Sequence, residues 1–127
     1  MMCVPTEFRM SPIHGIGVFL LQPVKKGDLV WRFDSRIDRV YTESEIATLP
    51  ETMQQFIKMY SCFDKQSGVW VWYGDHGRHI NHSETPNTQS LSIAFGDDIA
   101  LTDIAAGEEL TTDYNTICDV TRMTGKL

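Results

Sequence analysis

A polar run from Arg78 to Asn87 lies between two apolar runs and constrains the fold more than any other part of the chain. The run is too polar for a buried strand and has too few helix formers for a stable helix. Pro86 fixes its own φ and favours an extended residue before it. Asn81 and Ser83 can bond nearby backbone groups, which favours a tight turn. We predict a loop between two strands, and its composition alone also fits a surface loop that caps its own backbone.

Short apolar runs separated by turn residues make up much of the remaining chain. A first expected strand ends at residue 10. The other expected strands cover residues 17–21, 29–33, 61–64, 69–73, 89–95, 99–102 and 109–114. Turn signals recur about every 8–12 residues, which is typical of small β domains. At 127 residues the chain is long enough to bury a core. We therefore predict one mainly β domain over residues 1–127.

Two short helices are expected before the polar run. Thr42 and Glu45 have the spacing of a capping box, which predicts a helix that Pro50 ends. Residues 51–60 place their apolar side chains on one face of a second helix. The tail, residues 117–127, has little periodicity, and we expect it to be loosely ordered.

The charge of the chain limits the classes of partner. Its formal net charge is −6, from 17 acidic and 11 basic residues. This argues against direct nucleic-acid binding and fits a cationic substrate, although acidity also simply keeps proteins soluble. No apolar run approaches the ~20 residues of a membrane-spanning helix, and the N-terminus lacks the layout of a secretory signal. We expect an intracellular protein, cytoplasmic by default, with a nuclear or host-directed location left open.

The cysteines and histidines suggest no metal site. Cys3, Cys62 and Cys118 are far apart and form no zinc pattern. A scattered, odd number of cysteines is typical of reduced thiols in a cytosolic protein, which we predict here. His14, His76 and His79 show no metal-like spacing, and we interpret them as structural or exposed.

Two further motifs flank the polar run. Gly15-Ile16-Gly17 precedes an apolar strand, and residues 106–114 have the sequence Ala-Gly-Glu-Glu-Leu-Thr-Thr-Asp-Tyr. Each motif alone is weak, because short glycine patterns occur in many proteins. In this order, with Asn81-His82-Ser83 between them, they resemble the SET-domain family of protein-lysine methyltransferases over about residues 8–116.

The resemblance implies a fold and a reaction. The SET fold has small curved sheets, short helices and a pseudoknot in which the C-terminal segment passes under an earlier loop. The implied reaction transfers a methyl group from S-adenosylmethionine to the side-chain amine of a lysine in a protein or peptide. Many relatives carry a cysteine-rich zinc segment after the catalytic tyrosine. Here Cys118 stands alone after Tyr114, so the lid of the site must come from elsewhere, and a homodimer is compatible with that need.

The resemblance also assigns residues. Tyr114 matches the catalytic tyrosine, whose hydroxyl would orient the methyl group and the amine. Ile16 and Gly17 would contact the cofactor through their backbone. Asn81 and His82 would hold it through directed hydrogen bonds.

Two positions match less closely. Tyr60 lies where relatives often have a tyrosine that reaches the cofactor or the lysine channel, and a core tyrosine on a helix face explains it equally well. Thr112 stands where many relatives have Phe or Tyr, which leaves mono-, di- and trimethylation open. Trp70, Trp72 and Tyr73 supply aromatic surface for a channel.

The chemistry explains the need for such a channel. An attacking amine must be neutral, and removing a proton from lysine, with a pKa near ~10.4, costs about 4 kcal/mol at pH 7.4. A dry aromatic channel lowers that cost. Two other classes compete with the enzyme: a catalytically silent SET module that binds cofactor or a partner, and a β-rich structural domain. The joint presence of Tyr114, Asn81 and His82 favours the enzyme.

Overall fold

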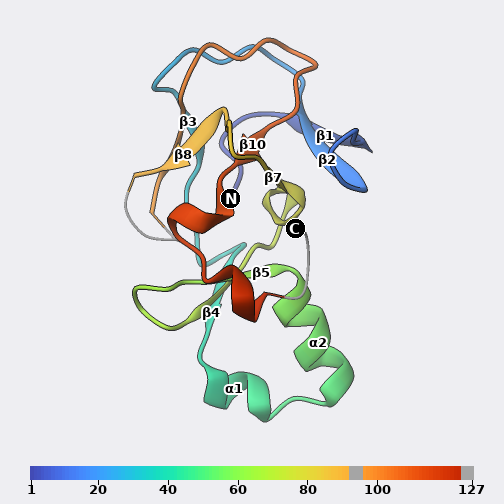
Figure 1. Ribbon diagram of the computed structural model, residues 1–127, viewed down its shortest axis with the longest axis vertical. Helices are drawn as coiled ribbons and strands as arrows, with labels where there is room; N and C mark the ends of the chain where they lie inside the picture. Colours follow the sequence, from blue (N-terminus) through green and yellow to red (C-terminus); the bar gives the residue numbers. More distant parts are fainter. Residues whose placement is uncertain (92–95, 124–127) are drawn as a thin grey trace.

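A computed structural model describes residues 1–91 and 96–123 of the chain. It has small sheets stacked along the long axis, with both α-helices at one end (Figure 1). The described part contains no helix that is long and apolar enough to cross a membrane.

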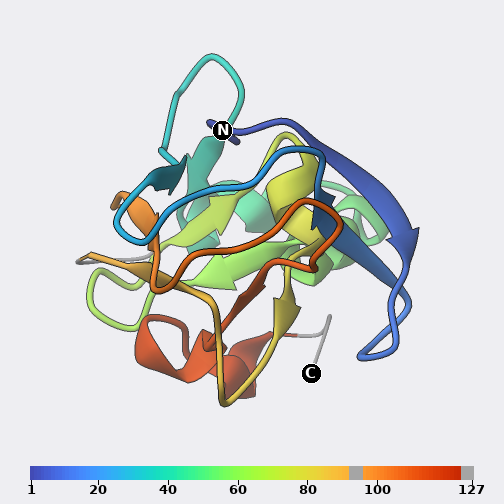
Figure 2. The same cartoon turned by 90° about the horizontal axis from the view of Figure 1, so that it is seen from above.

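The first sheet is a hairpin of β1 (Thr6–Met10) and β2 (Ile16–Leu20), as predicted. It lies at the edge of the molecule in both ribbon views (Figures 1 and 2). Gly15 makes the turn possible with φ +47°, a conformation that other residues rarely adopt. The apolar run that follows is buried from Gly17 onward.

A second antiparallel sheet has the order β3 (Leu29–Trp31), β9 (Asp98–Ala100), β8 (Thr88–Ser90). It shares a core with β2, and the main buried side chains of this core are Val18, Leu20, Val30, Ala100, Ile104 and Leu110. The strand predicted over residues 89–95 is confirmed at its start, and its last four residues lie outside the described part of the chain.

The third sheet pairs β4 (Arg39–Tyr41), β6 (Trp70–Trp72) and β5 (Ser61–Phe63). The hairpin of β5 and β6 was predicted, whereas β4 was missed because three residues with a charge among them leave no periodic signal.

The two predicted helices pack beneath the third sheet. They are α1 (Glu43–Ala47), which begins at the predicted capping box of Thr42 and Glu45, and α2 (Glu51–Met59). The second core lies between these helices and the sheet, and its buried members are Ile46, Ile57, Phe63 and Trp70.

The fourth sheet joins distant parts of the chain. In it β7 (Asn81–His82) runs parallel to β10 (Thr111–Thr112). On the other side the loop after β7 bonds to the same segment: Asn87 Nδ2 donates to the Glu109 carbonyl at 2.8 Å, and Thr88 Oγ1 donates to the Thr111 carbonyl at 2.7 Å. The C-terminal segment is thus held on both sides by residues 81–88, which is the predicted pseudoknot of the SET fold.

The polar run is more ordered than predicted. It contains the 3₁₀ helix η1 (His76–His79), which the Asp75 side chain caps, and then β7. Only the part after His82 forms an irregular loop. The prediction that this polar composition excludes a buried strand is wrong, because Asn81 is fully buried with its amide hydrogen-bonded.

The end of the chain also differs from the expectation. After β10 come two 3₁₀ helices, η2 (Tyr114–Thr116) and η3 (Val120–Arg122). Between them Cys118 forms a disulfide with Cys62 of β5, so the prediction of reduced thiols is wrong for this pair. Residues 117–123 therefore pack against the domain, in contrast to the loosely ordered tail that we expected, and 124–127 lie outside the described residues.

Candidate active site

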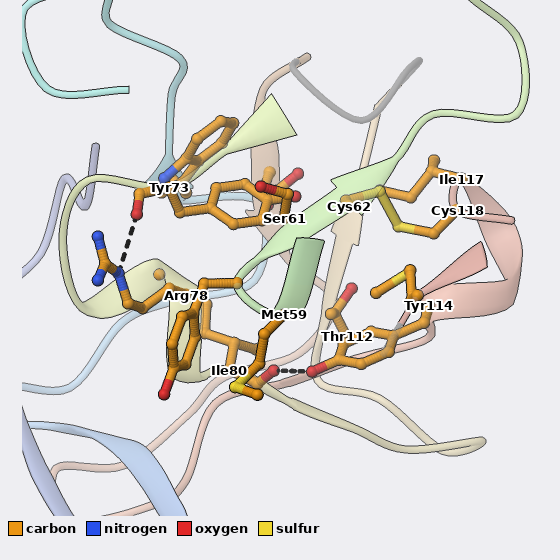
Figure 3. Close-up of a pocket in the computed structure, with 15 residues that line it drawn as sticks. Met59, Ser61, Cys62, Tyr73, Arg78, Ile80, Thr112, Tyr114, Ile117 and Cys118 are labelled. Atoms are coloured by element: carbon orange, nitrogen blue, oxygen red, sulfur yellow. Dashed lines mark hydrogen bonds between the residues drawn. A yellow bond between two sulfur atoms is a disulfide. The ribbon is translucent and has the colours of Figure 1, made fainter. Parts of the chain in front are cut away.

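A pocket opens between β5, the residue that follows β6, η1 and the segment that follows β10 (Figure 3). Aromatic and apolar side chains make most of its wall, among them Met59, Tyr60, Tyr73, Ile80 and Tyr114. The disulfide and Met123 complete it on the C-terminal side. Segments that are far apart in the sequence therefore form one aromatic pocket.

Tyr114 is fixed at both its backbone and its hydroxyl. The backbone N–H donates to His82 Nδ1 at 3.1 Å, and the hydroxyl donates to the Ile80 carbonyl, as the dashed line in Figure 3 marks. Burial raises the pKa of the Tyr114 hydroxyl, so it stays protonated at physiological pH. The pocket thus contains a neutral, oriented phenol.

Asn81 lies at the centre of a buried polar network. Its Nδ2 lies 2.8 Å from Glu109 Oε1, 3.1 Å from Ser11 Oγ and 3.1 Å from the His14 carbonyl. The Ser11 hydroxyl donates to Glu109 Oε2 at 2.9 Å. We call these three side chains the Ser11–Asn81–Glu109 network. It ties the turn before β2 to β7 and to the C-terminal motif.

Gly17 is required by this network. A Cβ at Gly17 would lie 2.1 Å from Glu109 Oε1 and 3.0 Å from the Ser11 Cβ. The absence of a side chain at Gly17 therefore lets the Glu109 carboxylate pack directly against the backbone. Ile16, the other predicted member of this motif, is 41% exposed at the start of β2.

The predicted cofactor residues Ile16, Gly17, Asn81 and His82 come together around this network. The Asn81 amide reaches the Ile16 carbonyl at 3.4 Å, and His82 follows Asn81 on β7. None of these four residues belongs to the described lining of the aromatic pocket. The region around the network and the aromatic pocket are therefore two separate regions of the site. Tyr114 links them, because it lines the pocket and bonds His82.

Tyr60, the remaining predicted site residue, lies at the C-terminal end of α2 and lines the pocket. Its ring contacts Phe56 and His79 edge-on, with centroids 5.1 and 5.4 Å apart. The Arg78 guanidinium lies 5.4 Å from its centroid, and Arg78 Nε donates to the Tyr73 carbonyl at 3.0 Å (Figure 3). Arg78 thus braces this wall of the pocket.

Asp98 places a carboxylate in the pocket wall. It is the first residue of β9, between Trp31 of β3 and Ser90 of β8 in the sheet. Burial raises the pKa of Asp98 to about 7, and a hydrogen bond from Ser90 offsets part of that rise. Its Oδ1 is buried and has no hydrogen-bond partner among the described residues.

A profile of the SET domain matches residues 15–115 of the chain. The chain belongs to the SET-domain family. A histone-lysine N-methyltransferase of Mycosarcoma maydis, specific for lysine 4 of histone H3, is 29% identical over 114 residues, which is 85% of this chain and 8% of that protein. The chain therefore spans only a small part of this curated relative.

Solved structures share the SET fold. The Chaetomium thermophilum Polycomb Repressive Complex 2 bound to S-adenosylmethionine aligns with a TM-score of 0.68 and 22% identity, over 91% of this chain and 16% of that one. A candidate histone methyltransferase of Plasmodium falciparum aligns with a TM-score of 0.60 and 19% identity, over 87% of this chain and 93% of that one. At these identities the likeness establishes the fold.

Several residues of this SET domain escaped the sequence interpretation. Glu109 was part of the C-terminal motif but was assigned no role. Its place next to the apolar Leu110 was the one signal that its carboxylate points into the domain. Ser11, Ser61 and Asp98 carried no signal, because each lies in an ordinary turn or strand pattern. Trp70 was expected to supply channel surface, but it packs in the helix-side core and donates to Glu43 instead.

Proposed function

We propose that this SET domain transfers a methyl group from S-adenosylmethionine to the side-chain amine of a protein lysine. The observation that carries the proposal is Tyr114, a neutral phenol held on the Ile80 carbonyl inside an aromatic pocket and bonded to His82 of β7. Family membership and the named activity of the fungal relative support it.

The residues around the Ser11–Asn81–Glu109 network fit the amino-acid end of the cofactor. Asn81 Oδ1 is buried and has no partner among the described residues, so it can accept a hydrogen bond from an ammonium group. Ile16, which is 41% exposed, and the His82 side chain, which is 21% exposed, lie beside it. In this proposal Ile16, Gly17, Asn81 and His82 hold the cofactor, which supplies an electrophilic methyl group on a sulfonium.

The pocket residues prepare the other reactant. Aromatic rings around the amine keep water away, which lowers the cost of removing its proton. The Tyr114 hydroxyl donates to Ile80, so its oxygen lone pairs are free to accept weak C–H···O contacts and orient the reacting groups. Holding the reactants in line supplies most of the remaining catalysis. Tyr60 would line the channel from the α2 side.

The acceptor is a lysine on a cationic protein segment. The net charge of −6 suits a basic peptide, and the relative named for lysine 4 of histone H3 makes histone H3 the first acceptor to test. A histone substrate would place the activity inside the cell, in the nucleus. The disulfide-tethered segment 117–123 would form part of the lid, and a homodimer could extend it further.

The test has two stages. Calorimetry with S-adenosylmethionine should give one binding site per chain. Incubation with labelled cofactor, histone H3 and a cell lysate should then label protein lysines, identified by mass spectrometry. Binding without transfer to any protein would favour the catalytically silent module, and no binding would favour a structural domain.

A further inference from the structure

The aromatic pocket carries polar groups that the proposed roles leave unused. Trp31, Ser61 and Asp98 all line it, and Trp31 Nε1, Ser61 Oγ and Asp98 Oδ1 are buried without a hydrogen-bond partner among the described residues. Buried polar groups without partners cost free energy, so such a cluster indicates a ligand or water that completes it.

The charges around the pocket indicate which ligand fits. Asp98 is an acid in this wall, and Arg78 is the only lining residue with a positive charge in the part of the chain that the structure describes. Arg78 is committed elsewhere, since its Nε donates to the Tyr73 carbonyl and its guanidinium lies 4.6 Å from the Trp72 ring centroid. The described pocket lining therefore offers the Asp98 carboxylate no available cationic side chain, and the Met1 amino group offsets only part of the burial that raises its pKa. An entering ammonium would provide a partner inside the pocket.

We propose that Asp98 binds the ammonium group of the acceptor lysine in this pocket and accepts its proton before methyl transfer. This rests on the proposed function for the identity of the amine. The proton moves from nitrogen to a carboxylate oxygen, which leaves a neutral amine with a free electron pair and a neutral acid. The methylated product carries a positive charge again, and Asp98 returns its proton to water when the product leaves.

The environment makes this transfer feasible. In water a carboxylate cannot deprotonate lysine, because their pKa values differ by about 6. Removing both groups from water raises the pKa of the acid and lowers that of the amine, since each charged form loses hydration. The pKa of Asp98 is already raised to about 7 by burial, so half of this gap is closed before the amine enters.

Other titratable groups near the pocket must be separated from Asp98 in any pH experiment. Arg32 and the exposed Asp97 form an ion pair, with Nη2 and Oδ2 2.9 Å apart. Tyr73 and Tyr114 keep their protons, because burial raises the pKa of each. The further charged or titratable groups around this region are the Met1 amino group, Cys3, Asp38, Tyr60, Asp64 and Arg78.

The first experiment measures binding of n-butylammonium, a mimic of the lysine side chain, to the whole chain by NMR titration between pH 5 and 9. Ionisation of Asp98 should tighten binding by about tenfold from pH 6 to pH 8. n-Butanol should bind with no such dependence. Equal affinity for the amine at both pH values would overturn the proposal, and this measurement needs no variant.

The second experiment compares Asp98→Asn with Asp97→Asn, the same change one residue away in an exposed ion pair. With a lysine acceptor, Asp98→Asn should lower turnover at pH 8 by about 100-fold, the scale of proton-transfer catalysis. Its residual rate should keep rising to pH 9, whereas the wild type should level off above pH 7. Asp97→Asn should behave like the wild type.

The two proposals fail in different ways. Methyl transfer with an unchanged pH profile in Asp98→Asn would refute the role of Asp98 and leave the enzyme intact. A pH-dependent amine site in a chain that transfers no methyl group would support Asp98 as the ammonium site and refute the proposed function.

Discussion

Two polar clusters in this domain differ in how far their hydrogen bonds are satisfied. In the Ser11–Asn81–Glu109 network both carboxylate oxygens accept hydrogen bonds and the Asn81 amide nitrogen has several acceptors in reach, so that among the described residues only Asn81 Oδ1 is left without a partner. In the pocket the Asp98, Ser61 and Trp31 groups are buried without partners among the described residues. A satisfied network stabilises a fold, whereas unsatisfied groups persist where function requires them. We infer that the network stabilises the pseudoknot and that the unsatisfied groups of the pocket bind a ligand.

The largest effect is expected at Tyr114, where the two regions meet. Tyr114→Phe removes only the hydroxyl oxygen, so turnover should fall by about 100- to 1000-fold while cofactor affinity holds. The free energy of unfolding should drop by about 1 kcal/mol for the lost bond to Ile80. Turnover, calorimetry and thermal melting should be measured together.

Tyr41→Phe is the matched control, because Tyr41 packs in the helix-side core. Full activity in a folded Tyr114→Phe variant would move catalysis away from this residue.

Next comes the disulfide that borders the pocket. It closes a sequence separation of 56 residues, so replacing both Cys62 and Cys118 by Ser should lower the free energy of unfolding by about 4 kcal/mol. Cys3→Ser, at an exposed free cysteine, should have no such effect. A reductant should lower the melting temperature of the wild type but not of the double variant. If the wild type melts at the same temperature with and without reductant, the cross-link does not form in solution.

Local signals explain what could be predicted from the sequence. The Thr42–Glu45 capping box and the β5–β6 hairpin depend on neighbouring residues, and both are confirmed. The resemblance assigned His82 and Tyr114 to one site, and the structure places the His82 ring against the Tyr114 backbone, a contact that the sequence did not predict.

Contacts between distant segments explain what could not be predicted. Cys62 and Cys118 have Cα atoms 5.6 Å apart only because η2 turns the chain back onto β5. The raised pKa of Asp98 likewise depends on burial between two strands, whereas its local sequence, Gly96-Asp97-Asp98, is that of a turn.

The same chemical change should have opposite effects in the two clusters. Glu109→Gln puts an amide donor opposite Asn81 or Ser11 and should destabilise the fold by about 2 kcal/mol. Asp98→Asn removes a charge that burial disfavours and should stabilise it by about 2 kcal/mol at pH 8.

The pH dependence fixes the sign of the Asp98 effect. The pKa of Asp98 is raised in the folded state. The destabilisation of the fold by the buried carboxylate is therefore absent below the unfolded pKa of ~3.9 and grows as the pH rises to about 7. The melting-temperature difference between Asp98→Asn and wild type should therefore appear between pH 4 and pH 7 and stay constant above. A stabilisation that is the same at pH 4 and pH 8 would contradict the raised pKa.

The smallest effect concerns the fit of Gly17 against Glu109. Gly17→Ala brings a methyl group to the position that the carboxylate occupies, and the carboxylate cannot easily move because Ser11 and Asn81 hold it. We expect a loss of about 1–2 kcal/mol, the scale of overpacking. In a Glu109→Ala background the overlap with the carboxylate is gone and only the Ser11 Cβ stays close, at 3.0 Å, so the same substitution should cost clearly less, about 0.5 kcal/mol. This double-mutant cycle isolates the contact, because each single variant also changes the backbone or the hydrogen bonds.

Gly27→Ala, at a glycine with open space and φ +89°, controls for strain without crowding. Equal costs of Gly17→Ala in both backgrounds would show that the glycine serves something other than the network.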